Sequence, residues 1–340
     1  MTTSTALDPK LLEILCCPAC RGKLDYDPRA AELRCAACVF NYPIVDGIPV
    51  LFPLDVKAHF EELFGRYWDS EDRAETYDRF VEGAQSMLGM HNYQGERRAT
   101  VEVLGELSGH RLLDCGCGNG RFFDEFPPDL FTVGIDASLN MLRVCRQKER
   151  CSRLVCCELE HLPFVDAAFD RVLSVRVIQH LVKQREAVVE MDRVLQPGGE
   201  LVLHLYNQYT SKSIAKAIRM SPRWQPIFDA PFRAMSRWIS PFGPWPLDYD
   251  LYNTVPQISR WYRELGLSVV QVRGAGFGFH KWVFDGFGIA AWLEKRFPKA
   301  WGRYLDASLR IQEFLGRRWP FNVVMEKFVI KGLKRRPSNA

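Results

Sequence analysis

Three glycines spaced two residues apart constrain this 340-residue chain more than any other feature. They are Gly116, Gly118 and Gly120 in the stretch LLDCGCGNGRF, and an apolar run that ends at Asp114 precedes them. Glycines in such a turn let the backbone approach a ligand without a Cβ in the way. A dinucleotide-binding turn has its third glycine one residue later, so the spacing argues against that class of site.

Further motifs follow the glycine turn in a fixed order. TVGIDAS ends a second strand at Asp136, about 20 residues on, where a carboxylate can accept hydrogen bonds from ribose hydroxyls. The later motifs are ELEHLPFVDAAFDRVLSV, VRVIQHL and LQPGGELVLHLY. Over roughly residues 90–274, this series resembles class I S-adenosylmethionine (SAM) methyltransferases, such as those of ubiquinone and menaquinone biosynthesis. The resemblance implies SAM as the cofactor.

The resemblance also implies a fold and a set of site residues. The fold is α/β, with a Rossmann-like, mostly parallel sheet, an antiparallel last strand and helical insertions near the C-terminus. The residues expected to bind SAM are Asp114, Gly116, Gly118, Gly120, Asp136, Met141, Glu158, Leu159 and Arg176.

Each of these positions has an expected role. Asp114 steers the aminoacyl end of SAM, and Glu158 contacts the adenine amino group while the Leu159 amide reaches the ring. Met141 packs either on the adenine or in the ordinary core. Arg176 touches the methionine part of SAM through its backbone.

Four cysteines near the N-terminus have the spacing of a zinc site. Cys17-x-x-Cys20 and Cys35-x-x-Cys38 are two short knuckles, and two such pairs complete a tetrahedral shell around Zn²⁺. Cys16 is an alternative to Cys17 as a ligand. A closed four-cysteine shell has no open position, so the predicted zinc is structural. Residues 11–53 resemble the zinc ribbon of tRNA-methyltransferase activator proteins, which binds and supports a methyltransferase subunit.

The motifs divide the chain into three predicted parts. Residues 1–55 form the zinc ribbon, residues 56–110 a helical lid or linker, and residues 111–340 the methyltransferase domain. The last part carries two insertions, at about 207–250 and 275–321, where we expect acceptor specificity to be encoded. A first strand is expected at Arg111–Cys115 and the start of a helix at Asn119–Phe126. A later helix is expected at Thr254–Gly266, with Thr254 as its N-cap, and a last strand at Asn322–Leu333.

The charge distribution and the length of the apolar runs indicate which kinds of partner and location to expect. Residues 205–340 carry 22 Lys/Arg and 9 Asp/Glu, hence +13, whereas the whole chain is only +4. The basic segment IAKAIRMSPRWQPIFDAPFRAMSRWI mixes cations with Trp, Phe and Ile, so an anionic membrane surface is one candidate partner. No run reaches 18 uncharged apolar residues and the N-terminus lacks a signal-peptide layout, so the predicted location is cytoplasmic, with peripheral membrane contact as an alternative.

The leading hypothesis is a SAM-dependent methyltransferase acting on a small-molecule or lipid-like acceptor. An RNA methyltransferase and a noncatalytic scaffold that retains the SAM fold are the alternatives. No catalytic residue is assigned. Candidates for a base, if the acceptor must lose a proton, are His204, Tyr206, Tyr252 and His280.

Overall fold

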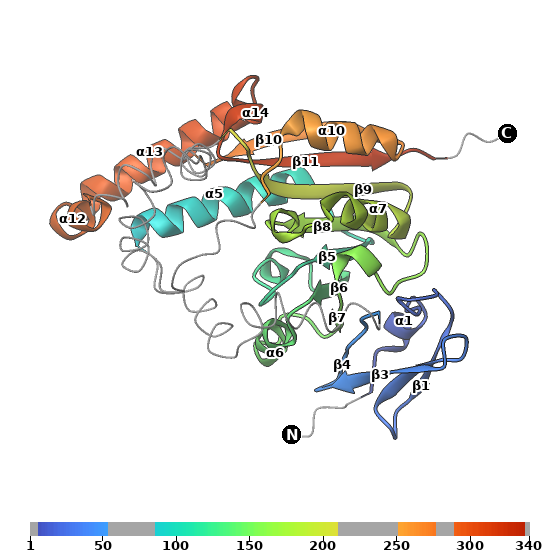
Figure 1. The fold of residues 1–340 in the computed structure, drawn as a ribbon. Coiled ribbons are helices and arrows are strands. Elements are labelled where there is room, and N and C mark those ends of the chain that lie inside the picture. The colour runs from blue at the N-terminus through green and yellow to red at the C-terminus, as the bar shows by residue number, and fades with distance from the viewer. Residues whose placement is uncertain (1–5, 54–85, 210–250, 277–288, 337–340) are drawn as a thin grey trace, which may run out of the picture.

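The computed structural model describes residues 6–53, 86–209, 251–276 and 289–336, which build a small sheet and a larger one (Figure 1). The small sheet is antiparallel, and its strands follow one another in chain order. A two-residue turn, Asp46-Gly47 with positive φ at both positions, joins its last two strands as hairpins require. The elements of this ribbon are α1 (Pro9–Leu12), β1 (Leu24–Asp27), β2 (Glu32–Cys35), β3 (Phe40–Val45) and β4 (Ile48–Pro49).

The larger sheet has seven strands in the order β10-β11-β9-β8-β5-β6-β7. They are β5 (Arg111–Cys115), β6 (Phe131–Asp136), β7 (Leu154–Cys156), β8 (Phe169–Val175), β9 (Leu195–Tyr206), β10 (Leu267–Ala275) and β11 (Lys327–Lys334). β11 runs antiparallel to both of its neighbours, and the remaining neighbours are parallel. The chain starts in the middle and reverses its direction of growth between β5 and β8, where open α/β sheets bind their ligands. The predicted fold class is confirmed.

Helices cover both faces of this sheet (Figure 1). They are α5 (Met87–Leu104), α6 (Leu139–Gln147), α7 (Gln184–Val194), α10 (Val255–Glu264), α12 (Ile289–Arg296), α13 (Pro298–Gly316) and α14 (Phe321–Val324). Along β9, Leu201, Leu203 and Leu205 belong to the core cluster that includes α7 and α10, whereas Val202 belongs to the cluster on the other face, with α5. This alternation follows from the two-residue period of a strand, and it buries apolar side chains on both faces.

The ribbon packs against the edge of the large sheet. Val50 forms a parallel bridge with Cys156 of β7, and the Leu51 amide donates a hydrogen bond to the Cys156 carbonyl at 2.8 Å. A second bridge joins Leu15 to Phe164. Because β7 is the last strand on this side, the ribbon covers backbone groups that an edge strand would otherwise expose.

Several predicted elements agree with the structure and two do not. Thr254 caps α10 by accepting from the Gln257 amide, as expected. The expected helix over 119–126 is wrong, because only Phe123–Glu125 forms a 3-10 turn before the chain extends at Phe126. The expected last strand over 322–333 is too long, since a helical turn occupies its first residues and β11 begins at Lys327.

Parts of the predicted division fall outside the described residues. Residues 54–85, 210–250 and 277–288 include most of the expected lid and the first insertion, with the basic segment that suggested a membrane surface. The boundaries at 55 and 110 therefore stay predictions. Among the described residues, no helix is long and apolar enough to cross a membrane.

Glu190 on α7 provides a test of how the ribbon is held. Its carboxylate accepts from Arg21 of the ribbon at 2.8 Å, from Arg193 at 2.7 Å, and from the Leu162 amide at 3.2 Å. Because Glu190 is only 7% exposed, Glu190→Gln should lower the free energy of unfolding by about 2 kcal/mol in chemical denaturation. Glu264→Gln is the matched control, since its ion pair with Arg185 is solvent-exposed and should matter little. Equal effects of the two substitutions would contradict this account.

Candidate functional site

The glycine turn after β5 is fixed to the end of β6. The amides of Gly116 and Cys117 both donate to the Ile135 carbonyl at 2.8 Å. The Gly118 amide donates to Asp136 Oδ2 at 2.8 Å. All three glycines have positive φ, and a Cβ on Gly118 would meet no atom within 4 Å. The middle of the turn therefore faces open space, so a ligand can approach its backbone.

Asp114 lies beneath this turn with its carboxylate almost fully buried, at 2% exposure. None of the described residues donates a hydrogen bond to it. Burial raises the pKa of Asp114 to about 7, although the charge of Arg121 acts in the opposite direction. A buried carboxylate without a donor is costly unless a ligand supplies one, and an ammonium group suits it best.

Asp136 and the start of α6 form the next part of the site. Besides Gly118, the Asp136 carboxylate accepts from the Ser138 amide at 2.9 Å. Ser138 in turn caps α6 by accepting from the Met141 amide at 3.2 Å. Met141 is buried, at 4% exposure. The predicted residues Asp114 and Asp136 thus lie near the carboxyl ends of the neighbouring parallel strands β5 and β6, and Met141 lies in the first turn of the helix that follows β6.

Glu158 and Leu159 follow β7 at the same edge. Leu159 begins a 3-10 turn, Leu159–His161, and its side chain is buried. The Glu158 carboxylate contacts His161 Nδ1 and does not point freely into the site. Burial raises the pKa of the adjacent Glu160 to about 7, with the charge of Glu158 adding to the shift.

Arg176 follows β8 in a left-handed conformation with φ of 57°. Its amide donates to the His204 carbonyl at 2.8 Å, which joins the ends of β8 and β9. Its guanidinium forms an ion pair with Glu96 at 3.1 Å. A side-chain contact between Arg176 and a ligand carboxylate would therefore compete with Glu96.

A buried ionic cluster around Glu96 was not predicted from the sequence. Glu96 lies on α5 and binds both Arg176 and Lys327, the latter at 2.7 Å from β11. Burial acts to raise the pKa of Glu96, but the charges of these two partners outweigh it and hold the pKa well below its ordinary value. Pairs between distant segments leave no local pattern, so periodicity and spacing gave no signal for this cluster.

His204 occupies the same cluster at the end of β9. Thr100 Oγ1 donates to the Glu96 carbonyl at 2.9 Å, so it must accept from His204 Nδ1, also at 2.9 Å. His204 Nε2 is then an unprotonated acceptor, and it has no hydrogen-bond partner among the described residues. Burial lowers the pKa of His204 to about 3, so the ring is neutral at physiological pH.

The other base candidates are placed differently. Tyr206 Oη accepts from Arg176 at 3.4 Å, and its ring lies 5.8 Å from that of Tyr252. These two rings border the end of β9 on the side of α5 and Arg176. His280 lies outside the described residues.

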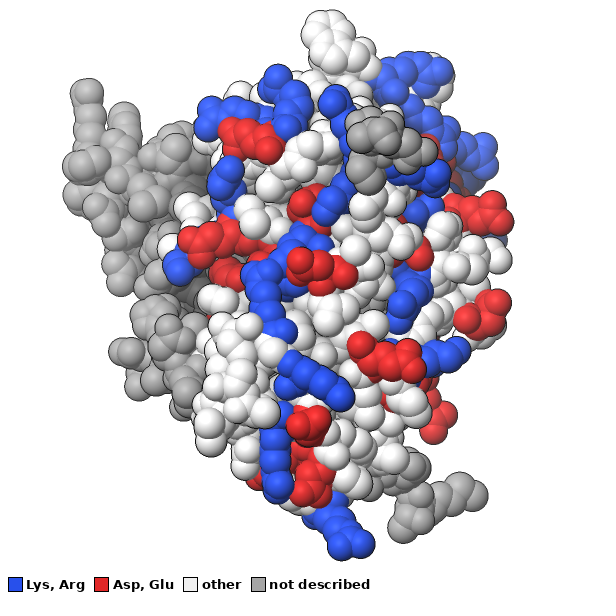
Figure 2. Space-filling view, turned by 90° about the vertical axis from the view of Figure 1, so that its right-hand side faces the viewer, with Lys and Arg blue, Asp and Glu red and all other residues white. Residues whose placement is uncertain are grey.

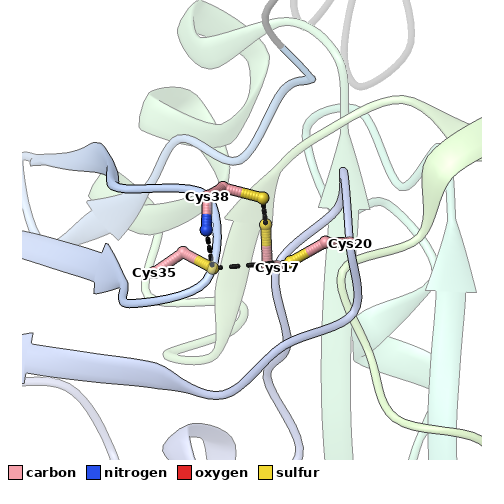
Figure 3. Close-up of side chains that lie close together, drawn as sticks. All are labelled: Cys17, Cys20, Cys35 and Cys38. Carbon is pink, nitrogen blue, oxygen red and sulfur yellow. Dashed lines mark hydrogen bonds between the residues drawn. The ribbon is translucent and has the colours of Figure 1, made fainter.

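The four predicted zinc ligands converge from two loops of the ribbon (Figure 3). Their sulfur atoms all lie within 4.8 Å of one another; Cys17 and Cys38 are 3.9 Å apart, and Cys20 and Cys35 are 3.5 Å apart. Four sulfurs bonded to one zinc ion at about 2.3 Å would lie about 3.8 Å apart. Cys16 is not part of the cluster, which resolves the choice between Cys16 and Cys17.

The electrostatics of this cluster also fit a bound cation. Burial acts to raise the pKa of Cys17, but a hydrogen bond from Tyr42 and backbone amides lower it to about 7. Hydrogen bonding to Cys20 and burial raise the pKa of Cys38 to about 12. Four thiols this close cannot all ionise unless a metal ion compensates their charge, as zinc does in four-cysteine sites.

Comparisons with known proteins agree with both the methyltransferase domain and the zinc ribbon. The methyltransferase domain family matches residues 113–203, and the Trm112p-like protein family matches residues 8–47. A candidate methyltransferase of Encephalitozoon cuniculi is 35% identical over 170 residues, covering 49% of this chain and 72% of that protein. An uncharacterised protein of Methanocaldococcus jannaschii is 39% identical over 97 residues, but this chain spans only 41% of its length.

A quinone-modifying enzyme and a solved structure complete the comparison. The demethylmenaquinone methyltransferase of Listeria welshimeri is 26% identical over 225 residues, which cover 64% of this chain and 89% of that enzyme. The crystal structure of magnesium protoporphyrin IX methyltransferase from Synechocystis, with S-adenosylhomocysteine bound, has the same fold. It aligns with a TM-score of 0.50 at 12% identity, over 81% of this chain and 99% of that one. This chain belongs to the SAM-dependent methyltransferases and carries an N-terminal Trm112-like zinc ribbon.

Proposed function

We propose that this enzyme methylates a small-molecule or lipid-like acceptor, and that SAM lies over the glycine turn between Asp114 and Asp136. The observation that carries the SAM assignment is the buried Asp114, whose carboxylate has no donor among the described residues and which directly precedes the turn where Gly118 has open space around it. The ammonium group of SAM would complete the hydrogen bonding of Asp114. Gly116 and Gly120 allow the backbone approach, and Asp136 binds the ribose hydroxyls.

The remaining predicted residues would surround the adenine and the methionine part. Glu158 is proposed to bind the adenine amino group, with the Leu159 amide reaching the ring and Met141 packing on its face. Arg176 contributes its backbone, since its side chain is engaged by Glu96. These roles follow from the family motifs and from the neighbouring positions of the residues at the edge of the sheet.

SAM supplies an electrophilic methyl group together with its own leaving group. The protein then mainly has to orient the two reactants and exclude water. Asp114 would bind the amino group of the cofactor and Asp136 its ribose, and two such separate contacts fix the direction in which the cofactor lies. His204 is a poor candidate for the base, because burial lowers its pKa to about 3 and leaves the residue 0% exposed, out of reach of an acceptor.

We expect the acceptor to bind at the end of β9, beside Arg176, Lys327, Tyr206 and Tyr252, and we call this part of the site the acceptor edge. Its chemistry favours a small, aromatic or lipid-like molecule. The cations Arg176 and Lys327 at this edge are both paired with Glu96, so they are poorly available to a phosphate backbone. The Tyr206 and Tyr252 rings offer a wall on which a flat ring can pack. The similarity to a demethylmenaquinone methyltransferase, over 89% of that enzyme, supports the same class of acceptor.

RNA is the second candidate acceptor, because the ribbon matches the Trm112p-like family. On one face of the molecule, the distribution of charged side chains argues against RNA as the acceptor. Figure 2 shows acidic and basic side chains interspersed on the face turned 90° from the view of Figure 1. Arg171 and Lys331 both pair with Glu200, at 3.3 and 3.0 Å. These pairs leave Arg171 and Lys331 poorly available to a phosphate backbone.

The ionisation of Asp114 predicts how SAM affinity depends on pH. Binding of an ammonium group requires the carboxylate, so SAM should bind about tenfold more weakly at pH 6 than at pH 8 in calorimetry, given a pKa of about 7. Asp114→Asn should bind weakly at both pH values and lose this dependence. A wild-type affinity that does not change between pH 6 and 8 would contradict the proposed contact.

The same raised pKa predicts the opposite trend for the stability of the free enzyme. Folding favours the protonated form of Asp114. Its contribution to the free energy of unfolding is complete below about pH 4 and is lost as the pH rises through about 7. The free energy of unfolding of wild type and Asp114→Asn, measured between pH 4 and 8 with and without SAM, separates the two trends.

We also propose that Cys17, Cys20, Cys35 and Cys38 hold one structural Zn²⁺. Cys17→Ser should lose the bound zinc, measured by elemental analysis, and should melt at a lower temperature. Cys16→Ser is the matched control, because it changes an adjacent buried thiol outside the cluster. Retention of zinc by Cys17→Ser together with its loss from Cys16→Ser would reverse the assignment.

The acceptor class can be tested with methyl-labelled SAM. We expect the purified enzyme to transfer label to the organic-solvent extract of cells and not to the RNA fraction, as measured by mass spectrometry. Asp136→Ala should remove the labelled product by weakening SAM binding. Label recovered in RNA, and lost in that variant, would establish the second candidate and exclude the first.

A further inference from the structure

The outer surface of α12, α13 and α14 carries an unusual concentration of apolar side chains. Eight of the fifteen large apolar residues that are exposed in the described part of the chain lie between residues 289 and 324. They are Trp292, Phe297, Tyr304, Ile311, Phe314, Trp319, Phe321 and Val324. The most exposed is Trp319, at 80%.

Four of these side chains lie along one side of α13, counting Phe297 at its N-terminal end. Phe297, Tyr304 and Ile311 are seven residues apart, and Phe314 follows three residues later, so they share one stripe of the helix. The side chains that α13 buries against the protein, such as Trp301, lie on a different face. Trp292 extends the stripe onto α12, because its ring contacts that of Phe297 at 5.7 Å.

Basic residues lie in the same segment as this apolar stripe. Residues 289–324 contain seven Lys/Arg and three Asp/Glu. Of the acids, Glu294 binds the Met87 amide at 2.9 Å and Glu313 pairs with Arg98 at 3.1 Å, so both are engaged by α5. Only Arg317 pairs with an acid of the described chain, Glu102 of α5. The other six cations have no acidic partner within 4 Å among the described residues: Lys295, Arg296, Lys299, Arg303, Arg310 and Arg318.

We propose that this surface, the α12–α14 face, docks on an anionic lipid bilayer. Exposed aromatic and aliphatic side chains enter the headgroup region, while the flanking Lys and Arg bind anionic headgroups. The positive charge of the face is complementary to such a surface. This docking rests on the proposed function, because it brings an enzyme with a lipid-like acceptor to the membrane that holds the acceptor.

The position of the face relative to the site supports this docking. α12 and α13 extend beyond the sheet at the left of Figure 1, on the side where α5 begins. α13 packs directly on α5, where Gln312 binds His91 at 2.8 Å. The same α5 carries Glu96 to the acceptor edge. A lipid-like acceptor leaving the bilayer here would therefore meet the helix that borders the site.

Vesicle flotation of the full-length protein tests the proposal without SAM. We expect binding to phosphatidylcholine vesicles that contain about a third phosphatidylglycerol, and much less binding to pure phosphatidylcholine. Ile311→Asp/Phe314→Asp and Arg303→Glu/Arg310→Glu should each weaken binding about tenfold or more. High salt should weaken binding of the parent protein.

Matched substitutions elsewhere control for unspecific effects. Val165→Asp/Val182→Asp changes two exposed apolar residues, and Lys23→Glu/Arg29→Glu reverses two ribbon charges. Both controls should float like the parent. The proposal is wrong if the parent does not float, if the controls lose binding equally, or if the Ile311/Phe314 variant converts a dimer into a monomer in sedimentation. Because SAM is absent, failure of this test is distinguishable from failure of SAM binding.

Discussion

The hydrogen bond from the Gly118 amide to the Asp136 carboxylate is the contact on which the site depends. It joins the turn after β5 to the end of β6, and the two amides that reach Ile135 strengthen the same connection. A turn with so few side chains has little else to fix its shape. The turn has open space at Gly118 and follows the buried Asp114, whose carboxylate has no donor among the described residues. An approachable backbone together with such a carboxylate suits a cationic amino-acid tail.

The ribbon, which is part of the same chain, also stabilises the proposed SAM site. It covers β7 through Val50 and Leu51, and it binds α7 through the Arg21–Glu190 ion pair. Cys156, the residue bridged by Val50, is followed within two residues by Glu158 of the proposed adenine site. The ribbon therefore stabilises the strand end from which part of the proposed SAM site extends. Zinc would act at a distance, by holding the ribbon in shape.

The sequence was most informative where a local pattern carries the chemistry. The four cysteines and the three glycines were identified from spacing alone, and the ends of β5 and β9 agree with the expected strands. Sequence reasoning was poorer where the outcome depends on distant packing. The start of a helix is expected from the sequence over residues 119–126, yet Gly120 adopts φ of 77° and packs close to Cys145, so only a 3-10 turn forms. The Glu96 cluster joins α5, β8, β9 and β11, and no window of sequence contains its members together.

The central claim is that the ammonium group of the methyl donor binds Asp114 while its ribose binds Asp136. A crystal structure with S-adenosylhomocysteine tests it most directly. The account predicts the amino nitrogen within about 3 Å of an Asp114 carboxylate oxygen and both ribose hydroxyls at Asp136. An empty crevice at saturating ligand, or a ligand whose amino group binds elsewhere, would contradict the account.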